Sequence, residues 1–204
     1  QKAALTAEGA TLTVSGAAVK TGSSWAENSD GTYSRTYVAT TAGTGLTVSV
    51  KLSGWSAAAV SPAYSIGAGA AVPSESALTV TPDSIVANDT AESVITLTLK
   101  DKYLNDVKSA TVGFTSDLAG VTFKAVTNNE DGTYSSSLTG KLAGKATVGV
   151  RVDNKAFAVT GKTVTLTADS STARLTNPGA GVSVVTTGAV ADGESENSVK
   201  VTVT

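Results

Sequence analysis

The sequence predicts an all-β protein built of tandem β-sandwich domains of about 100 residues each. Three observations support this prediction: apolar and polar residues alternate along most of the chain, turn sequences separate the alternating stretches, and two long segments nearly repeat each other. Alternation with a period of two indicates strands that bury one face. No stretch longer than a turn or two has the periodicity of a helix.

Each alternating stretch predicts one strand. Residues 46–52 place Leu, Val, Val and Leu on one face and Thr, Ser and Lys on the other. The same pattern predicts strands at 95–99, 110–114, 146–152 and 199–203. Between them, Asp-Gly and Asn-Asn pairs predict tight turns at 30–31, 128–129, 131–132 and 192–193.

The repeat defines the size of the structural unit. "NSDGTYSRTYVATTAGTGLTVSVKL" (28–52) is followed by "NNEDGTYSSSLTGKLAGKATVGVRV" (128–152), so that Tyr134 lies 101 positions after Tyr33. A second pair, "IVANDTAESVITLTLK" (85–100) and "AVADGESENSVKVTVT" (189–204), matches at a constant shift of 104. A unit of about 100 residues is too long for a solenoid repeat and matches one β-sandwich domain.

Composition excludes several classes of function. The 204 residues include no Cys, His or Met, so imidazole bases, thiolate nucleophiles and thiolate metal sites cannot form. A net charge of -2 provides no electrostatic surface for nucleic acid. We therefore expect no enzyme, no catalytic, cofactor-binding or metal-binding residues, and no nucleic-acid partner.

Three segments taken in order resemble the bacterial immunoglobulin-like domains of the intimin and invasin adhesin family. They are "SALTVTPDSIVANDTAESVITLTLKDKYLNDV", "GVTFKAVTNNEDGTYSSSLTG" and "LAGKATVGVRV". Asp106 stands where this family usually has Pro, which leaves the shape of that turn open. The residues at positions typical of the family are Lys100-Asp101, Asn105, Gly132-Thr133-Tyr134 and Ala143-Gly144.

The resemblance implies a stalk segment of an inverse autotransporter, exposed at the Gram-negative cell surface. A β-barrel elsewhere in the parent protein would provide the membrane attachment, and tandem immunoglobulin-like domains would project a distal adhesive tip. The neighbouring repeats of the same chain would be its nearest partners. In the alternative, these domains themselves bind a host-cell or extracellular-matrix receptor, a glycan or a neighbouring cell.

The repeat also predicts the domain boundaries. Residues 1–74 are expected to form the C-terminal portion of an immunoglobulin-like domain, residues 75–170 a complete domain, and residues 171–204 the N-terminal portion of a further one. Two explanations of the partial domains stay open. Either the parent chain was cut within domains, or the last strands of one molecule complete the first domain of another by head-to-tail strand complementation.

Aromatic residues are the candidate contact sites. Trp25 and Trp55 have no aromatic counterpart in the second copy of the repeat, so we expect them to contact a ligand or to pack at a domain junction. Tyr33 and Tyr134 occupy matching positions. They are expected to fill the cores of their domains, with their hydroxyl groups reaching the surface.

Acidic loop residues of the complete repeat allow two interpretations. Hard oxygen ligands at domain junctions can bind calcium, but no dense Asp-x-Asp-x-Asp spacing is present, which favours solvated turn carboxylates. Asn88-Asp89-Thr90 is likewise interpreted as a turn rather than a glycosylation site. The acidic residues concerned are Asp83, Asp89, Asp101, Asp106 and Asp117.

Overall fold

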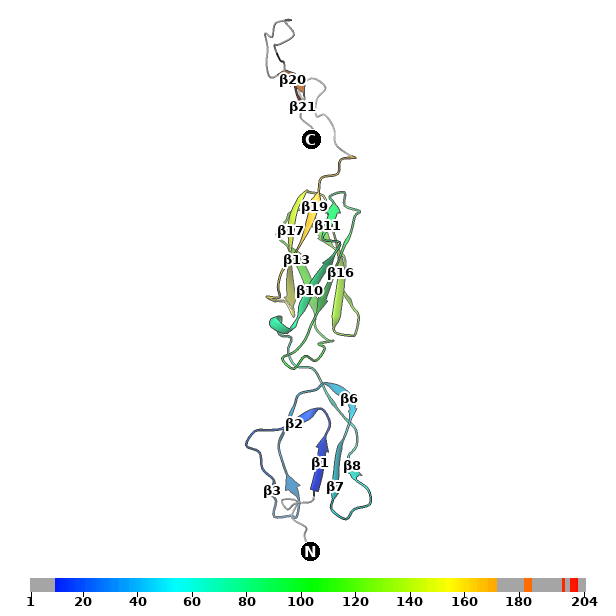
Figure 1. Cartoon of the computed structure of the whole chain (residues 1–204), viewed down its shortest axis with the longest axis vertical. Coiled ribbons are helices and arrows are strands. Elements are labelled where there is room, and N and C mark those ends of the chain that lie inside the picture. The colour runs from blue at the N-terminus through cyan, green and yellow to red at the C-terminus, as the bar shows by residue number, and fades with distance from the viewer. Residues whose placement is uncertain (1–9, 172–181, 185–195, 197–198, 202–204) are drawn as a thin grey trace.

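The computed structural model describes residues 10–171, 182–184, 196 and 199–201. Two β-units follow one another along the long axis in Figure 1: the first unit comprises residues 10–66 and the second unit residues 71–167. Within the described residues the only helix is a single 3₁₀ turn, Pro73–Glu75. No helix in this part of the chain is long and apolar enough to cross a lipid bilayer.

One sheet of the second unit has the strand order β10–β12–β16–β14, with antiparallel pairing throughout. A further short strand, β15, pairs with β16. Along β16 every second residue is buried, as the period of a half-buried strand requires. The strands are β10 (Ala77–Thr81), β12 (Ser93–Thr98), β14 (Val121–Phe123), β15 (Thr127–Asn128) and β16 (Thr133–Gly140).

The other sheet has the order β11–β19–β17–β13, and β18 pairs with β17. β11 runs parallel to β19, whereas the other pairs are antiparallel. Two sheets connected in this order form an immunoglobulin-like sandwich, so the predicted fold class is confirmed. The strands are β11 (Ser84–Val86), β13 (Val112–Ser116), β17 (Gly144–Val152), β18 (Lys155–Ala156) and β19 (Lys162–Thr167).

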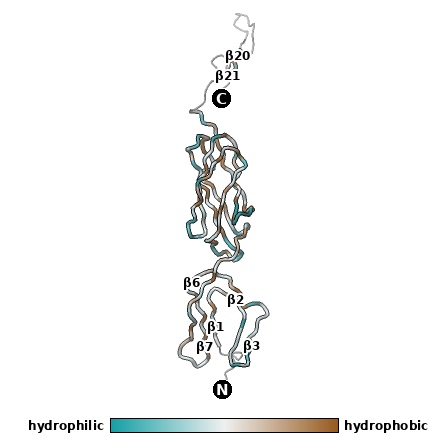
Figure 2. The backbone as a smooth tube through the Cα atoms, turned by 180° about the vertical axis from the view of Figure 1, so that it is seen from behind, coloured by the Kyte–Doolittle hydropathy of each residue, from teal (hydrophilic) through white to brown (hydrophobic). Residues whose placement is uncertain are grey.

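The hydrophobic core lies between these two sheets. Ile95 and Leu97 of β12 and Leu138 of β16 are completely buried, because alternate positions of each strand face inward. Figure 2 shows the same alternation, with hydrophobic and hydrophilic positions interleaved along the strands of the sandwich. The other buried apolar residues are Leu78, Ile85, Leu99, Val107, Tyr134, Ala146, Val148, Val150, Val152, Val164 and Leu166.

Tyr134 lies in this core, as predicted, and is 1% exposed. Its hydroxyl group does not reach the surface, so that part of the prediction is wrong. The hydroxyl donates to the carbonyl oxygen of Val107 (3.1 Å) and accepts from the amide of Ala110 (2.9 Å). Two backbone groups just before β13 therefore satisfy it inside the protein. Its counterpart Tyr33 is only half-buried.

The first unit has a three-stranded sheet, β1–β7–β8, and three two-stranded pairs, β2–β5, β3–β4 and β6–β9. All of these pairings are antiparallel. The strands are β1 (Ala10–Val14), β2 (Ala17–Val19), β3 (Ala26–Glu27), β4 (Tyr33–Ser34), β5 (Tyr37–Ala39), β6 (Gly43–Leu46), β7 (Val48–Leu52), β8 (Ala59–Val60) and β9 (Tyr64–Ile66).

Pairings of the first unit recur in the second with matching register. Leu12 lies opposite Val50 in β1–β7, as Phe114 lies opposite Val150 in β13–β17. In the same way β2–β5 corresponds to β14–β16, β3–β4 to β15–β16, and β6–β9 to β17–β19. Within residues 10–66, no strand corresponds to β10, β11 or β12.

The repeated Asp-Gly-Thr-Tyr sequence forms the same turn in both units. Asp30 Oδ1 accepts from the backbone amide of Thr32 (2.9 Å) and from its hydroxyl (2.6 Å). Asp131 Oδ1 accepts in the same way from the amide (2.8 Å) and hydroxyl (2.6 Å) of Thr133. The hydroxyl bonds, followed by the amide bonds, lower the pKa of both carboxyl groups.

Of the predicted third portion, 171–204, the structure describes chiefly two strands. β20 (Val182–Val184) and β21 (Val199–Val201) form an antiparallel pair. Most of the remaining residues of this portion lie outside the described residues. The proposed boundaries of the three portions stay predictions.

Candidate functional site at the junction between the two units

Asp101 organises the loop that faces the first unit. The residue follows β12, is 2% exposed, and lies in a bridge with Ala71. Its Oδ1 accepts from the amides of Tyr103 (2.8 Å) and Asn105 (3.0 Å), and its Oδ2 accepts from the amide of Gly69 (2.8 Å). One carboxylate thus joins the segment between the units to the loop 101–106.

The charge of Asp101 is stabilised without a cationic partner among these contacts. Burial by itself would raise the pKa of this carboxyl group. The side-chain amide of Asn105 and the backbone amides of Gly69, Asn105 and Tyr103 outweigh burial and lower the pKa to about 2. Asp101 is therefore ionised at neutral pH, as an acceptor of several hydrogen bonds.

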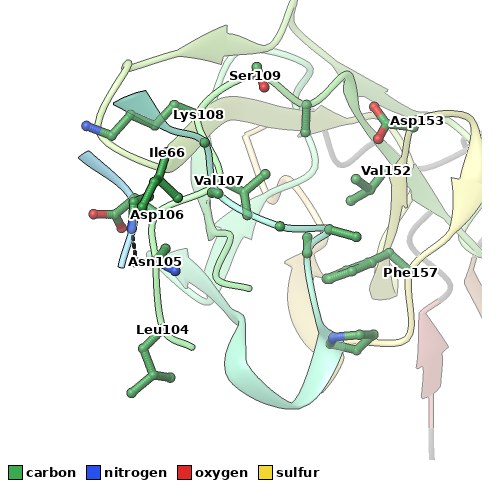
Figure 3. Close-up of a pocket in the computed structure, with 18 of the residues that line it drawn as sticks. Ile66, Leu104, Asn105, Asp106, Val107, Lys108, Ser109, Val152, Asp153 and Phe157 are labelled. Carbon is green, nitrogen blue, oxygen red and sulfur yellow. Dashed lines mark hydrogen bonds between the residues drawn. The ribbon is translucent and has the colours of Figure 1, made fainter. Parts of the chain in front are cut away.

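Asn105 extends this network into the first unit. Its Oδ1 accepts from the amide of Ala42 (2.9 Å), and its Nδ2 donates to the carbonyl oxygen of Thr40 (2.9 Å). The same Nδ2 lies 2.9 Å from Oδ2 of Asp101. Figure 3 shows Asn105 and Ile66 of the first unit on the same side of the junction. The Asp101–Asn105 pair is consequently a direct hydrogen-bonded connection between the two units.

Two hollows lie beside this connection. The larger, about 1050 Å³, is lined by Ala42, Gly43 and Ile66 of the first unit and by Val152 and Phe157 of the second, among others. Figure 3 shows Val152 and Phe157 on the side of this hollow away from Asn105. The smaller, about 480 Å³, is lined in part by Val38, Asp101 and Tyr103. Both hollows follow from the way the two units meet end to end.

Asp106 is the last residue of the loop 101–106, and its side chain contacts residues outside the loop. It pairs with Lys100 at 2.7 Å, and its side chain packs against the backbone of Gly132. Gly132 has a φ of 93°, and a Cβ atom there would lie 2.7 Å from Cβ of Asp106. Because the position needs both a left-handed backbone and empty space, only glycine is accommodated without strain.

We expect Gly132→Ala to lower the free energy of unfolding of the second unit by about 2 kcal/mol or more, through backbone strain and the clash with Asp106. Urea unfolding followed by far-UV circular dichroism measures the change. Gly161→Ala is the matched control, because an added Cβ there would approach nothing closer than Thr147 Cγ2 at 3.9 Å. Equal losses in the two variants would contradict this account of Gly132.

The predicted contact residues lie away from this junction. Trp25 is half-buried, and the guanidinium carbon of Arg35 lies 5.9 Å from the centre of its ring. Trp55 follows β7 and is 45% exposed. Neither side chain lines the hollows between the two units. A contact of either residue with a ligand or at another domain junction stays a prediction.

The other acidic loop residues make local contacts. Asp117 Oδ1 accepts from the amide of Thr147 (2.7 Å), and this residue's hydroxyl and then its amide lower the pKa of Asp117. Asp89 pairs with Lys141 at 3.3 Å. Asp83 contributes its carbonyl oxygen to the amide of Thr165 (2.8 Å). Within the described residues, no three acidic side chains are placed to share a metal ion.

Asn88 forms a turn, as predicted. Its Oδ1 accepts from the amides of Thr90 (3.0 Å) and Ala91 (2.8 Å).

The sequence did not indicate the role of Asn105, which was recognised only as a position typical of the family. Its partners Thr40 and Ala42 lie more than sixty positions earlier in the chain, and no local pattern indicates such a contact.

β10 and β11 follow each other in the chain but pair in different sheets, and this arrangement defines the second unit as an immunoglobulin-like domain. Residues 72–169 match the family model described as Invasin, domain 3. The structure of invasin, described as a bacterial integrin-binding protein, is 31% identical with a TM-score of 0.58, and the match covers 82% of this chain and 33% of invasin. The second unit therefore belongs to the intimin and invasin adhesin family.

Two other solved structures extend the comparison. FdeC, described as an Escherichia coli adhesin, is 26% identical with a TM-score of 0.61 over 87% of this chain and 55% of FdeC. InvD of Yersinia pseudotuberculosis is 23% identical with a TM-score of 0.62 over 86% of this chain and 51% of InvD, and it shows the shared fold alone. The chain thus spans between a third and just over half of these three structures.

Proposed function

We propose that this chain is a non-enzymatic stalk segment of a bacterial surface adhesin, and that it projects a distal adhesive tip from the outer membrane. The observation that carries the proposal is the end-to-end arrangement of the two units, with Asn105 bonded to the backbone of the first unit (Figure 1). A direct connection of this kind limits bending, and a stalk transmits length only if its junctions resist bending. The similarity to invasin and FdeC supports the cell-adhesion context.

The stalk proposal makes a prediction about Asn105. We expect Asn105→Ala to broaden the distribution of angles between the units, because the bonds to Thr40 and Ala42 are lost. Small-angle X-ray scattering should show a shorter mean maximum dimension of the chain. Because the bond between Asn105 and Asp101 is also lost, the free energy of unfolding of the second unit should fall by about 1 kcal/mol.

Asn129→Ala is the matched control. The side-chain Nδ2 of Asn129 donates to the hydroxyl of Thr133 (3.0 Å) within the second unit, at an exposed turn. Scattering profiles of this variant should match those of the unsubstituted chain. If Asn105→Ala also left the profile unchanged, this junction would not supply stiffness to the stalk.

The second candidate function is direct binding by these domains. It is favoured by the match to 33% of a protein described as integrin-binding, and by the exposure of Trp55. The test is binding of the labelled chain to epithelial cells and to a panel of matrix proteins and glycans, beside an unrelated immunoglobulin-like control. Saturable binding that falls in Trp55→Ala supports this function, whereas binding no greater than the control supports the stalk.

A further inference from the structure

The two units are attached to each other at two places. One is the covalent segment between β9 and β10, and the other is Asn105, whose side-chain amide bonds to the backbone of Thr40 and Ala42. Among the residues that the structure describes, no other hydrogen bond or ion pair joins residues 10–66 to residues 71–167. Two attachments leave one axis, the line through both, about which the units can rotate without breaking either.

The covalent attachment turns most freely at Gly67. From the next residue onward the segment belongs to the second unit, because Ala68 packs against its core and the amide of Gly69 bonds to Asp101 (2.8 Å). The residue before it, Ile66, is the last residue of β9. A Cβ atom at Gly67 would meet no atom within 4 Å apart from its chain neighbours, so the backbone there has room to change its dihedral angles.

The attachment through Asn105 is similarly compact. A single amide group makes both bonds to the first unit, to the amide of Ala42 and to the carbonyl oxygen of Thr40, each at 2.9 Å. The same amide is held by Oδ2 of Asp101 at 2.9 Å. Because both bonds start from one planar group at the end of a side chain, a small rotation of the first unit only tilts them, whereas a displacement of that unit breaks them.

The two hollows lie on opposite sides of these attachments. The larger is lined by Thr44 of the first unit and Lys155 of the second, and the smaller by Val38 and Lys102 in the same way. Rotation about the axis would therefore narrow one hollow and widen the other. The residues that line both hollows, and so separate them, are Ile66, Gly67, Gly69, Ala70 and Asn105.

We infer that the junction is a hinge with one axis. The units swing in the plane that contains the two hollows, where there is room for movement. The attachments at Gly67 and Asn105 oppose bending in the perpendicular direction and twisting about the long axis of the chain. The inference goes beyond the proposed function, since such a hinge would swing in one plane whether or not the chain projects an adhesive tip.

Distances between pairs of nitroxide labels, measured by electron paramagnetic resonance, test the direction of this swing. The chain has no Cys, so each pair is introduced as two cysteine substitutions in the full chain. Thr44→Cys with Lys155→Cys spans the larger hollow, and Val38→Cys with Lys102→Cys spans the smaller. All four positions are exposed, so the labels leave both units intact.

A reference pair, Thr41→Cys with Leu104→Cys, lies beside the axis. Thr41 stands between the two residues that Asn105 contacts, Leu104 precedes Asn105, and both are exposed. We expect the distance distributions of the two spanning pairs to be at least about twofold wider than that of the reference pair. Asn105→Ala should widen the reference distribution to a similar extent, because the axis is lost, whereas Asn129→Ala should leave all three distributions unchanged.

Three results would overturn the inference. Narrow distributions for all pairs would show a rigid junction, and equally wide ones would show a joint that bends in every direction. A reference distribution that stays narrow in Asn105→Ala would show that this residue does not define the axis. A rigid junction would still be compatible with a stalk. Conversely, a scattering profile unchanged by Asn105→Ala would count against the stalk proposal, while the label distances would still decide whether the junction is a hinge.

Discussion

Replacing Asp101 with Asn is expected to lower the free energy of unfolding of the second unit by about 3 kcal/mol. The change keeps the shape of the side chain but turns one acceptor into a donor. Both carboxylate oxygens accept backbone amides, so the new NH₂ group must face either Gly69 or the amides of Tyr103 and Asn105. A buried donor is then left facing another donor, and the charge-assisted bonds are lost.

Asp106→Asn is the matched control for this change. Asp106 lies in the same loop, its side chain is 39% exposed, and it pairs with Lys100 near the surface. A pair of this kind contributes at most about 1 kcal/mol. Urea unfolding of both variants by far-UV circular dichroism gives the comparison, and similar losses in the two would show that burial of the Asp101 carboxylate is unimportant.

The pH dependence of stability provides a second signature of Asp101. Its pKa is about 2 in the folded protein, below the ordinary value of 3.8, so its contribution is present above the ordinary value and is lost as the pH falls from about 4 to about 2. We expect the free energy of unfolding of the unsubstituted chain to fall more steeply across this range than that of Asp101→Asn. Parallel curves would contradict the lowered pKa.

Replacing Leu97 with Ala is expected to lower the free energy of unfolding of the second unit by about 2–5 kcal/mol. Leu97 is completely buried and lies opposite Leu78 on one side and Tyr134 on the other. Truncation removes apolar contacts and leaves a cavity between two sheets whose remaining side chains can relax only in part.

The chain offers an internal control for this experiment. Both tryptophans, Trp25 and Trp55, lie in the first unit, so tryptophan fluorescence reports on that unit, while far-UV circular dichroism also reports on the second. Leu97→Ala should shift the unfolding transition of the second unit, seen by circular dichroism. It should leave the fluorescence transition of the first unit in place. Val94→Ala, on the same strand and 48% exposed, should cost less than about 1 kcal/mol. Loss of both transitions together in Leu97→Ala would show that the two units unfold as one.

The inward-facing strand residues could be predicted from the sequence because strand periodicity is a local property. Ile95, Leu97 and Leu99 alternate with polar residues in the chain, and all three are completely buried. The repeated Asp-Gly-Thr-Tyr was likewise sufficient to indicate a turn, because the Asp side chain bonds to a backbone amide two residues ahead.

The junction could not be predicted in the same way. Asp101 was one of five acidic loop residues, and the sequence did not separate it from exposed residues such as Asp89. The difference lies in the amide of Gly69, which reaches Asp101 from 32 positions earlier in the chain. The aromatic pattern pointed instead to Trp25 and Trp55, which lie outside the hollows of the junction.

The sequence by itself therefore determined the all-β class, the repeat and inward-facing residues such as Ile95, Leu97 and Val148. The strand pattern depends on neighbours two positions apart, and the repeat is found by comparing two segments of the same chain. Only the tertiary structure decided that the hydroxyl of Tyr134 is satisfied inside the core and that Asn105 bonds across the junction. Both features depend on which distant backbone groups come within hydrogen-bond distance, and the packing of whole units controls this, not local alternation.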